Sequence, residues 1–375
     1  MNILHVLPDL DPRSGGIVTA VKGLAAAQAD LGHEARISAT YVGVKPELSG
    51  LKSVVDLYPA HPIWHYSYGI RRGLEESIKA ADIVHAHSMW DYPTLCAISI
   101  CNKLKKPCVL SPHGMLDTSH YARSILKKNI YIILFGKILL NSIKAVHFTS
   151  EMERSSSCLF GFRPKCVVLP LGLPRKSIER LPERGLFGKE FERLHGKKYV
   201  LFLGRLHPKK NPKGALRAFR LLAEPYPNLF LVLAGPGQPR YVRRLQKLAE
   251  ELHLADRVLF TGMIGLERKM QAYRDAVLFL LPSHRENFGM AVLEAMAAAC
   301  PVVISPFVDL AGEIRSARAG FVCAQDPIAA ASEMKKILDD PAMGEEMGNN
   351  GRRLVLEKFT WDAVAPEFIK LYKKL

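Results

Sequence analysis

Two glutamates eight residues apart, Glu286 and Glu294, are the first candidates for chemistry in this chain. A carboxylate accepts hydrogen bonds from two adjacent hydroxyls, so either residue suits a ribose or a hexose diol. The helix expected to start between them would aim its backbone N–H groups, at residues 287–290, toward an oxyanion or sugar hydroxyls. The structural alternative makes Glu286 a charge at a helix start and Glu294 one half of a surface ion pair.

The second candidate is a basic loop, GRLHPKKNPK at residues 204–213, which lies between an apolar run and a helical pattern. Arg205 and a lysine five residues later can converge on one anion at a helix N-terminus. A guanidinium fork and an ammonium point charge there suit a diphosphate. Charge alone does not rank Lys209, Lys210 and Lys213, and any one of them is also compatible with a solvated surface.

Two turns in the first half of the chain are weaker candidates. Gly15 and Gly16 permit a close approach of the backbone to a ligand, with a helix expected just beyond them, although a plain turn has the same composition. His113, which precedes a glycine, can supply a polar contact at a strand end. His85 and His87 compete for that role, and a structural role is favoured for both. The dinucleotide fingerprint GxGxxG is absent, which argues against a nicotinamide enzyme.

Alternating apolar runs and helical patterns must position these residues. In the first half, strands are expected at residues 3–7, 35–39, 83–86, 108–110, 145–148 and 167–169, with helices at 16–31 and 122–141. In the second half, strands are expected at 199–203, 229–234, 258–260, 277–281 and 302–304. This βαβ pattern predicts α/β domains with parallel sheets. Ligands bind at the carboxyl ends of such strands, where the candidate loops lie.

The length of 375 residues favours two domains over one core. We predict Rossmann-like domains at residues 1–175 and 197–358, with loops facing across a cleft. Residues 176–196, charged and containing Pro and Gly, are interpreted as a linker. A final helix is predicted at residues 359–375.

Composition narrows the partners and the compartment. The net charge of +16 fits an anionic small ligand, an anionic membrane face or a nucleic acid, or a basic surface without a partner. The lack of any recognisable nucleic-acid module argues against nucleic acid. Seven scattered cysteines without a CxxC pair argue for a reducing cytosol and against a zinc site. Apolar runs are too short to span a membrane, and the first residues are expected to form a strand, not a signal peptide.

One basic and apolar segment bears on membrane attachment. It is ARSILKKNIYIILFGKILLNSIK, which begins at Ala122, ends at Lys144 and contains no acidic residue. Such a segment can lie on an anionic leaflet, or it can be a helix that faces the core and has a basic outer side. The predicted location is therefore the cytoplasm, with peripheral attachment to the inner face of the membrane left open.

In this order and spacing, the motifs resemble the retaining glycosyltransferases of family 4, which have the GT-B fold. The resemblance covers nearly the whole chain. It comprises Gly15-Gly16 with the helix that ends LGH, HGM at His113, GRLHPKK, LAGPG, FTG, and the Glu286/Glu294 pair followed by PVVIS. It implies a nucleotide-sugar donor in the C-terminal half and an acceptor in the N-terminal half. The C-terminal helix then crosses back onto the N-terminal domain.

The resemblance also implies roles for individual residues. Arg205 and Lys210 would clamp the diphosphate and stabilise its charge as it leaves, and Glu294 would hold the ribose. Glu286 would hold the transferred hexose, with His113 beside that sugar. The predicted catalytic set is His113, Arg205, Lys210 and Glu286. The full predicted donor-binding set is Gly15, Gly16, Arg205, Lys210, Met263, Ile264, Glu286, Asn287, Phe288, Gly289, Met290, Leu293 and Glu294.

The family forms its bond with retention and requires no metal, and this chain lacks an Asp-x-Asp motif at a strand end. No cofactor and no metal are therefore expected. Asn211 follows Lys210 where many relatives have glycine, and this departure concerns the shape of the donor pocket. The sequence predicts transfer of a hexose from a UDP- or GDP-sugar to a lipid-linked or glycan acceptor, in exopolysaccharide or O-antigen synthesis. The alternatives are a non-catalytic membrane-surface binding protein of the same fold and a nucleotide-sugar epimerase.

Overall fold

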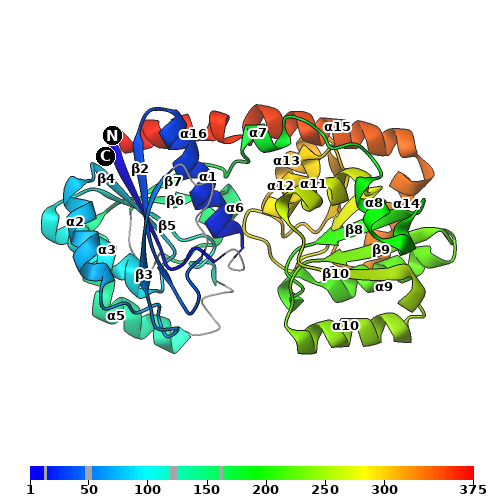
Figure 1. The fold of residues 1–375 in the computed structure, drawn as a ribbon, viewed down its shortest axis with the longest axis horizontal. Coiled ribbons are helices and arrows are strands. Elements are labelled where there is room, and N and C mark those ends of the chain that lie inside the picture. The colour runs from blue at the N-terminus through cyan, green and yellow to red at the C-terminus, as the bar shows by residue number, and fades with distance from the viewer. Residues whose placement is uncertain (12–14, 47–52, 119–124, 160–163) are drawn as a thin grey trace. The chain divides into compact units, whose positions relative to one another are not determined.

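The computed structural model describes residues 1–11, 15–46, 53–118, 125–159 and 164–375, without the side chains of residues 137–142 and 266. The chain forms two compact units (Figure 1). Unit 1 comprises Met1–Pro174 and Thr360–Leu375, and unit 2 comprises Arg175–Phe359. Each unit contains one parallel sheet with helices, which confirms the predicted α/β class.

Unit 1 contains a seven-stranded sheet in the order β3-β2-β1-β4-β5-β6-β7. The strands are β1 (Asn2–Leu7), β2 (Glu34–Tyr41), β3 (Val54–Pro59), β4 (Ile83–His87), β5 (Cys108–Ser111), β6 (Ile143–Phe148) and β7 (Lys165–Val168). The helices of its first part are α1 (Gly16–Asp30), α2 (Ile70–Ala80), α3 (Tyr92–Leu104), α5 (Ile125–Ser142) and α6 (Glu151–Ser156). Only β3 is absent from the predicted strands of this half; it lies at the sheet edge and is mostly half-buried, so its apolar signal is weak.

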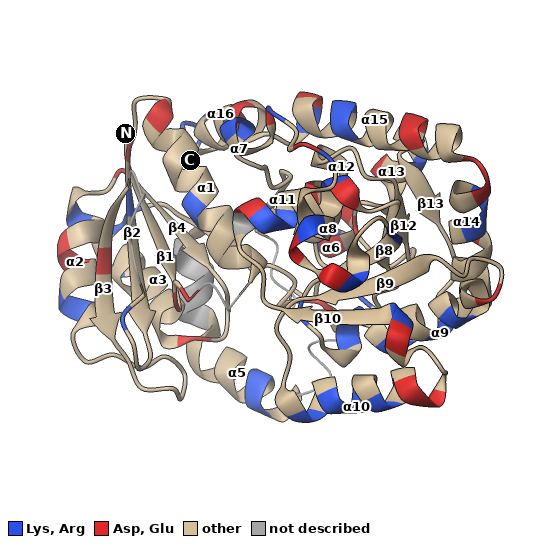
Figure 2. Cartoon of the chain, turned by 45° about the vertical axis from the view of Figure 1, so that its right-hand side comes forward, with Lys and Arg blue, Asp and Glu red and all other residues tan. Residues whose placement is uncertain are grey.

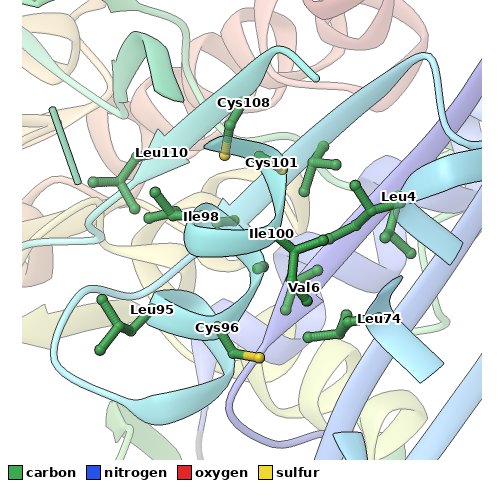
Figure 3. Close-up of a cluster of buried hydrophobic side chains, with 14 of the residues drawn as sticks. Leu4, Val6, Leu74, Leu95, Cys96, Ile98, Ile100, Cys101, Cys108 and Leu110 are labelled. Atoms are coloured by element: carbon green, nitrogen blue, oxygen red, sulfur yellow. The ribbon is translucent and has the colours of Figure 1, made fainter. Parts of the chain in front are cut away.

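The core of unit 1 follows from the periodicity of its helices. In α2 the buried residues Ile70, Leu74 and Ile78 recur every four positions, which places them on one helix face. Figure 3 shows Leu74 in one apolar cluster with Leu4 of β1 and with residues of α3 and β5. This packing holds the sheet rigid, and the carboxyl ends of its strands carry the polar residues described below.

Unit 2 contains a six-stranded parallel sheet in the order β10-β9-β8-β11-β12-β13. The strands are β8 (Lys198–Leu203), β9 (Leu229–Ala234), β10 (Val258–Gly262), β11 (Leu278–Leu281), β12 (Val302–Ile304) and β13 (Gly320–Val322). The longer helices are α9 (Pro212–Ala223), α10 (Pro239–Glu251), α11 (Leu266–Asp275), α12 (Met290–Ala297), α13 (Ala311–Ala317), α14 (Pro327–Asp339) and α15 (Pro341–Lys358). The three-residue edge strand β13 is too short for sequence periodicity to reveal.

Residues 176–196, interpreted from sequence as a linker, are folded onto unit 2. They contain α8 (Leu186–Glu190) and the 3₁₀ helix η2 (Glu192–Leu194), and α7 (Arg175–Ile178) precedes them. Phe187 and Leu194 are buried. The carboxylate of Asp275, at the end of α11, accepts the backbone N–H of Phe187 at 2.8 Å. Charge and proline content therefore do not mark a free connector here.

The C-terminal helix α16 (Trp361–Tyr372) belongs to unit 1. Its N-cap, Thr360, bridges Leu173 in parallel, and Trp361 packs against Gly23 of α1. A Cβ atom added to Gly23 would lie 2.1 Å from Nε1 of the indole, so glycine is needed for this contact. The last helix of the chain is thus part of the N-terminal fold.

Candidate functional site

The order of each sheet points to one place for a ligand. In both sheets the first strand in sequence lies inside the sheet, and the chain winds outward from it in both directions. The reversal falls between β1 and β4 in unit 1 and between β8 and β11 in unit 2. In open α/β sheets, ligands bind outside the carboxyl ends of the strands at this switch point. The loops after β8 and β11 contain the basic residues and the glutamates singled out from sequence.

Lys210 and Glu286 meet at the switch point of unit 2. The Nζ atom of Lys210 forms an ion pair with the Glu286 carboxylate, and both side chains are 18% exposed. Lys210 ends the 3₁₀ helix η3 (Pro208–Lys210), whereas Lys213 lies on the exposed side of α9. The structure thus brings Lys210 and Glu286, both predicted to bind the donor, into contact. A partly buried ammonium and carboxylate in contact form a polar centre that an anion or a hydroxyl can enter.

Asn211 has a backbone conformation that glycine adopts easily. Its φ of 56° lies in the left-handed region, which asparagine tolerates better than most residues. Its side chain accepts the N–H of Gly214 at 3.0 Å, which caps α9, and donates to the carbonyl of Pro282 at 3.1 Å. Asn211 therefore ties the β8 loop to the β11 loop.

The turn from β11 into α12 presents backbone donors. Glu286 N–H donates to the carbonyl of Phe307 at 3.0 Å, which fixes the start of the turn. Gly289, with φ of 90°, is the N-cap of α12, and no side chain caps the helix there. The first N–H groups of a helix have no intrahelical acceptor and carry the positive end of its dipole. Phe288 is buried. The turn can therefore bind an oxyanion or sugar hydroxyls through its backbone.

Glu294 lies in α12 and is buried. The hydroxyl of Tyr273 donates to its carboxylate at 3.1 Å, and the ammonium of Lys269 lies 4.0 Å away. Burial raises the pKa of Glu294, and Lys269, Tyr273 and Lys210 oppose that rise. Tyr273 and Lys269 are not among the residues predicted from sequence. Their spacing of four residues places them on one face of α11, and this spacing is the sequence signal that marks them.

The other predicted donor-binding residues of unit 2 differ in accessibility. Arg205 is exposed after β8, and Met263 is 64% exposed after β10. Ile264 is buried. Leu293 is fully buried and its backbone N–H donates to Gly289 at 3.1 Å, so its side chain supports the turn and presents nothing to a ligand.

In unit 1, two of the predicted residues begin α1 at the end of β1. Gly15 has φ of 89°, precedes α1 as its N-cap without a side-chain cap, and is exposed together with Gly16. Residues 12–14, which complete this loop, lie outside the described part of the chain. The first N–H groups of a helix lack intrahelical acceptors, so this exposed helix start can offer them to a ligand.

His113 occupies a constrained turn at the end of β5. Its φ of 49° and that of Gly114, 78°, are both left-handed. The buried carboxylate of Glu153 accepts the N–H of Gly114 and also that of Thr149 at 2.7 Å. The Nε2 atom of His113 lies 3.1 Å from Nδ1 of His87. The structure therefore joins the two histidine candidates that the sequence analysis treated as rivals.

Three buried histidines of unit 1, His5, His85 and His87, have ring nitrogens within 4.8 Å of one another. Among the described residues this is the group that could hold a metal ion. Its nitrogens are engaged in hydrogen bonds within the protein, as described below.

Lys and Arg are spread over both units. In α10 they occupy much of the exposed helix surface, with Glu250 and Glu251 at its end (Figure 2). Within residues 101–150 of unit 1, eight residues are Lys or Arg and Asp117 is the only acid. Among the described residues, no helix has both the length and the apolar character needed to cross a bilayer.

Comparison with solved structures establishes the class. The crystal structure of Anabaena Alr3699/HepE in complex with UDP and glucose superposes with a TM-score of 0.82 at 19% identity, over 100% of both chains. A sucrose-phosphate synthase from Thermosynechococcus elongatus gives 0.79 at 22% identity, over 100% of this chain and 98% of that one. These are GT-B proteins, and this protein has the GT-B fold.

Sequence comparison then gives the family. The model for Glycosyltransferase Family 4 matches residues 14–176, and the model for Glycosyl transferases group 1 matches residues 187–354. The chain belongs to glycosyltransferase family 4.

Individual relatives are more distant. A D-inositol 3-phosphate glycosyltransferase of Streptomyces avermitilis is 35% identical over 180 residues, 46% of this chain and 39% of that protein. The alpha-1,3/1,6-mannosyltransferase ALG2 of Mus musculus is 28% identical over 261 residues, 64% of this chain and 59% of that protein. The matches thus span between two fifths and three fifths of these relatives.

Proposed function

We propose that this protein is a retaining, metal-independent hexosyltransferase. It transfers a hexose from a nucleotide-diphosphate sugar to a lipid-linked or glycan acceptor, in the synthesis of an exopolysaccharide or an O-antigen. The observation that carries the proposal is the meeting of Lys210, Glu286 and the uncapped start of α12 at the switch point of unit 2. Family membership and the binding of UDP and glucose by the Anabaena neighbour support it.

The charges in unit 2 suit a diphosphate leaving group. Lys210 is held by Glu286 in the free protein, and a bound diphosphate offers its ammonium a second anion. Exposed Arg205, in the same loop, adds a bidentate donor. As the bond to the sugar breaks, negative charge grows on the phosphate oxygens, and fixed cations stabilise it most at that moment. These two side chains then supply the stabilisation that other transferases obtain from a metal.

Carboxylates and backbone groups would hold the rest of the donor. Glu294 accepts the two ribose hydroxyls, oriented by Tyr273. Glu286 and the first N–H groups of α12 hold the hexose. Met263 and Ile264 meet the base. Unit 1 binds the acceptor, and Gly15, Gly16 and His113 are its proposed contacts to the substrates.

Donor binding is tested by thermal unfolding of the full chain with UDP-, GDP- and ADP-sugars. A ligand that binds only the folded state stabilises it by RT ln(1 + [L]/Kd). The true donor should therefore give the largest rise in Tm. At a hundred times its Kd, it adds about 3 kcal/mol to the free energy of unfolding. Lys210→Met and Glu294→Gln should abolish that rise. Lys213→Met, in the same basic loop, should keep it. A rise that survives in both site variants would refute the assignment.

Turnover separates the alternative functions. The purified protein should release nucleoside diphosphate from its donor, with retention at the anomeric carbon and without added metal. Interconversion of donor sugars with no release of diphosphate would show an epimerase. Binding without any turnover, with a range of lipid-linked and glycan acceptors, would favour the non-catalytic binding protein.

We also propose that unit 1 attaches to an anionic membrane through α5. The outer face of α5 is apolar: Leu126, Ile130, Ile133 and Leu134 are exposed and recur at helical spacing. Leu126 and Ile133 are 71% and 80% exposed. Residues 122–124 of the predicted segment lie outside the described part. A core-facing helix with a purely basic outside, the alternative interpretation, does not account for this face.

The neighbourhood of α5 favours an anionic lipid surface over a protein partner. Exposed Ile63 and Tyr68 lie in a segment whose Trp64 packs against Tyr131 and Phe135 of α5. Aromatic and apolar groups of this kind suit the interfacial region of a bilayer. The excess of basic residues in residues 101–150 complements anionic headgroups.

Vesicle flotation tests the attachment. The protein should float with phosphatidylglycerol-rich vesicles and less with phosphatidylcholine vesicles, and salt should weaken binding. Burying one isoleucine contributes about 2 kcal/mol, so Ile133→Asp should weaken binding more than tenfold. Ile328→Asp removes a similarly exposed residue, 69% exposed, from α14 of unit 2 and is the matched control. Equal binding by both variants would exclude α5 as the attachment site.

A further inference from the structure

A continuous chain of hydrogen bonds runs through the interior of unit 1 and ends at His113. From His113 it passes through His87, His5, Gln28, Tyr372, His85, Ser111 and His147 to the carbonyl of Leu169. Its members come from α1, α16, the strands β1, β4, β5 and β6, the turn after β5 (His113) and the residue after β7 (Leu169). The donor–acceptor distances range from 2.6 Å, at Tyr372 and Ser111, to 3.4 Å between Gln28 and Tyr372.

The Leu169 end of the hydrogen-bond chain fixes which partner donates in each bond. The carbonyl of Leu169 can only accept, so Nε2 of His147, at 2.8 Å, must carry a proton. Burial lowers the pKa of His147 to about 4, so the ring is neutral and its Nδ1 accepts from the Ser111 hydroxyl at 2.6 Å. The Ser111 hydroxyl has only one hydrogen, which it donates to His147. It therefore accepts from Nε2–H of His85.

The same reasoning carries the direction to His113. Nδ1 of neutral His85 accepts the Tyr372 hydroxyl at 2.6 Å, so that oxygen accepts from the Gln28 amide. The Gln28 carbonyl oxygen then accepts Nε2–H of His5 at 2.7 Å. Nδ1 of His5 accepts from His87 at 3.0 Å, and Nδ1 of His87 accepts from Nε2–H of His113 at 3.1 Å. Every bond finds one donor and one acceptor, and each ring is the same neutral tautomer.

This arrangement leaves His113 with one defined group for a ligand. Its Nε2–H is used within the protein, and its Nδ1 is a lone pair. A carbonyl oxygen at the far end offers no place to deposit a proton, so the chain cannot carry one away from His113. The backbone around His113 is held as well, by two successive left-handed residues and by the Gly114–Glu153 hydrogen bond. Such constrained conformations concentrate at functional sites.

We propose that this chain locks His113 as the Nε2–H tautomer, so that its Nδ1 accepts a hydrogen bond from a substrate hydroxyl, with Tyr372 and Ser111 as positioning residues. The substrate part rests on the proposed transfer of a sugar, whose hydroxyls are the donors available to such a lone pair. His113 then orients a polyol through this lone pair. The C-terminal helix contributes to the site through Tyr372, although that residue touches no substrate.

A metal ion is the competing explanation for the histidine group. Nitrogens of His5, His85 and His87 lie close enough to share an ion. However, each of the two nitrogens of His5 and His85 already has a hydrogen-bond partner, and Nε2 of His87 points at Nδ1 of His5 from 3.0 Å. A neutral pair at that distance shares a proton in a normal hydrogen bond.

The tautomers are measured directly on full-length protein labelled with ¹⁵N-histidine. Long-range ¹H–¹⁵N spectra distinguish a protonated ring nitrogen from an unprotonated one and need no substrate. The His113 signals are assigned by their loss in His113→Gln. At pH 7 we expect a neutral ring with the proton on Nε2. A proton on Nδ1, a cationic ring, or a stoichiometric metal that is lost in His5→Gln would overturn the proposal.

Two variants break the chain at a distance from His113. In Tyr372→Phe the Gln28 amide loses its acceptor and can rotate, which lets His5, His87 and His113 reverse. In Ser111→Ala, His85 can reverse and permits the same rotation. Both variants should convert the single His113 tautomer into a mixture. Tryptophan fluorescence verifies that the variants remain folded.

Activity provides a second readout. Transfer by Tyr372→Phe and Ser111→Ala should fall by up to about tenfold, as expected for one hydrogen bond partly lost in the transition state. Tyr199→Phe, which removes a buried hydroxyl that donates to Ala272 in unit 2 at 2.7 Å, is the matched control and should change neither readout. A single unchanged tautomer in both chain variants would overturn the positioning role. Unchanged transfer by His113→Gln would overturn the substrate part while leaving the tautomer measurement intact.

Discussion

Acidification from pH 7 to pH 5 should destabilise unit 1 through its buried histidines. Burial lowers the pKa of His5 and of His147 from the ordinary 6.5 to about 4. It also lowers the pKa of His85, His87 and His113. A histidine whose pKa is lower in the folded state contributes stability that is complete above pH 6.5. That stability is lost as the pH falls toward 4, because the unfolded chain takes up the proton first.

The size of the effect follows from proton linkage. Each pH unit in which the unfolded histidine is protonated and the folded one is neutral costs about 1.4 kcal/mol. His5 and His147 should therefore each remove about 2 kcal/mol from the free energy of unfolding between pH 7 and pH 5. Their sum, about 4 kcal/mol, is a large part of the 5 to 15 kcal/mol that is typical of a folded domain. The other three histidines act in the same direction.

Tryptophan fluorescence isolates unit 1 in this assay. All three tryptophans of the chain, Trp64, Trp90 and Trp361, belong to that unit. Urea titrations at pH 7, 6 and 5 then give the unfolding free energy of unit 1 without a contribution from unit 2. The transition midpoint should move steadily to lower urea concentration as the pH falls.

One variant tests the assignment to a named residue. Gln at position 147 can still donate to the Leu169 carbonyl but does not titrate, so His147→Gln should lose about 2 kcal/mol less than the natural protein between pH 7 and pH 5. His61→Gln, at an exposed histidine of the same unit, should lose as much as the natural protein. A free energy that is equal at pH 7 and pH 5, or an unchanged slope in His147→Gln, would refute the reasoning.

Three further substitutions test the supports of the site. Gly23→Ala should cost about 1 to 3 kcal/mol and change tryptophan emission, because its Cβ would collide with Trp361; unchanged emission would argue against the α1–α16 packing. Glu153→Gln should cost about 1 to 3 kcal/mol in urea titrations, since its carboxylate holds the N–H of Gly114, and a neutral result would show that the turn does not depend on it. Asn211→Ala should lower stability by about 1 to 2 kcal/mol in calorimetry, because the cap is lost and alanine tolerates a left-handed φ less well than asparagine. Asn211→Gly should cost less, and the reverse order would contradict the role of the φ of residue 211.

Local signals in the chain were sufficient for much of the fold. The apolar run at residues 277–281, the turn that contains Glu286 and the Ala-rich helix around Glu294 are consecutive, so periodicity alone predicts a strand, a loop and a helix in that order. The same holds for Gly15 before α1 and for the basic loop before α9. The two edge strands were missed because β3 is mostly half-buried and β13 has only three residues, so neither gives a clear apolar pattern.

Local signals also misplaced one segment. Residues 176–196 have the charge and proline of a linker, yet Phe187 and Leu194 are buried in unit 2. Two contributions fold the segment onto unit 2: its few apolar residues are buried, and the carboxylate of Asp275, some ninety residues further along the chain, accepts backbone N–H groups of the segment.

Order along the chain thus specified two parallel α/β sheets, the loops that carry the charged residues and the membership of the family. Charge alone did not rank Lys210 among three lysines, and only the resemblance to a family pointed to it, because its partner Glu286 is 76 residues away. Nor did order along the chain reveal that His113 and Tyr372 share one hydrogen-bond chain, since Tyr372 is 287 residues from His85. Strands and helices depend on neighbours within a few positions, whereas the protonation and orientation of a buried polar group depend on whichever atoms the packed fold brings within 3 Å of it.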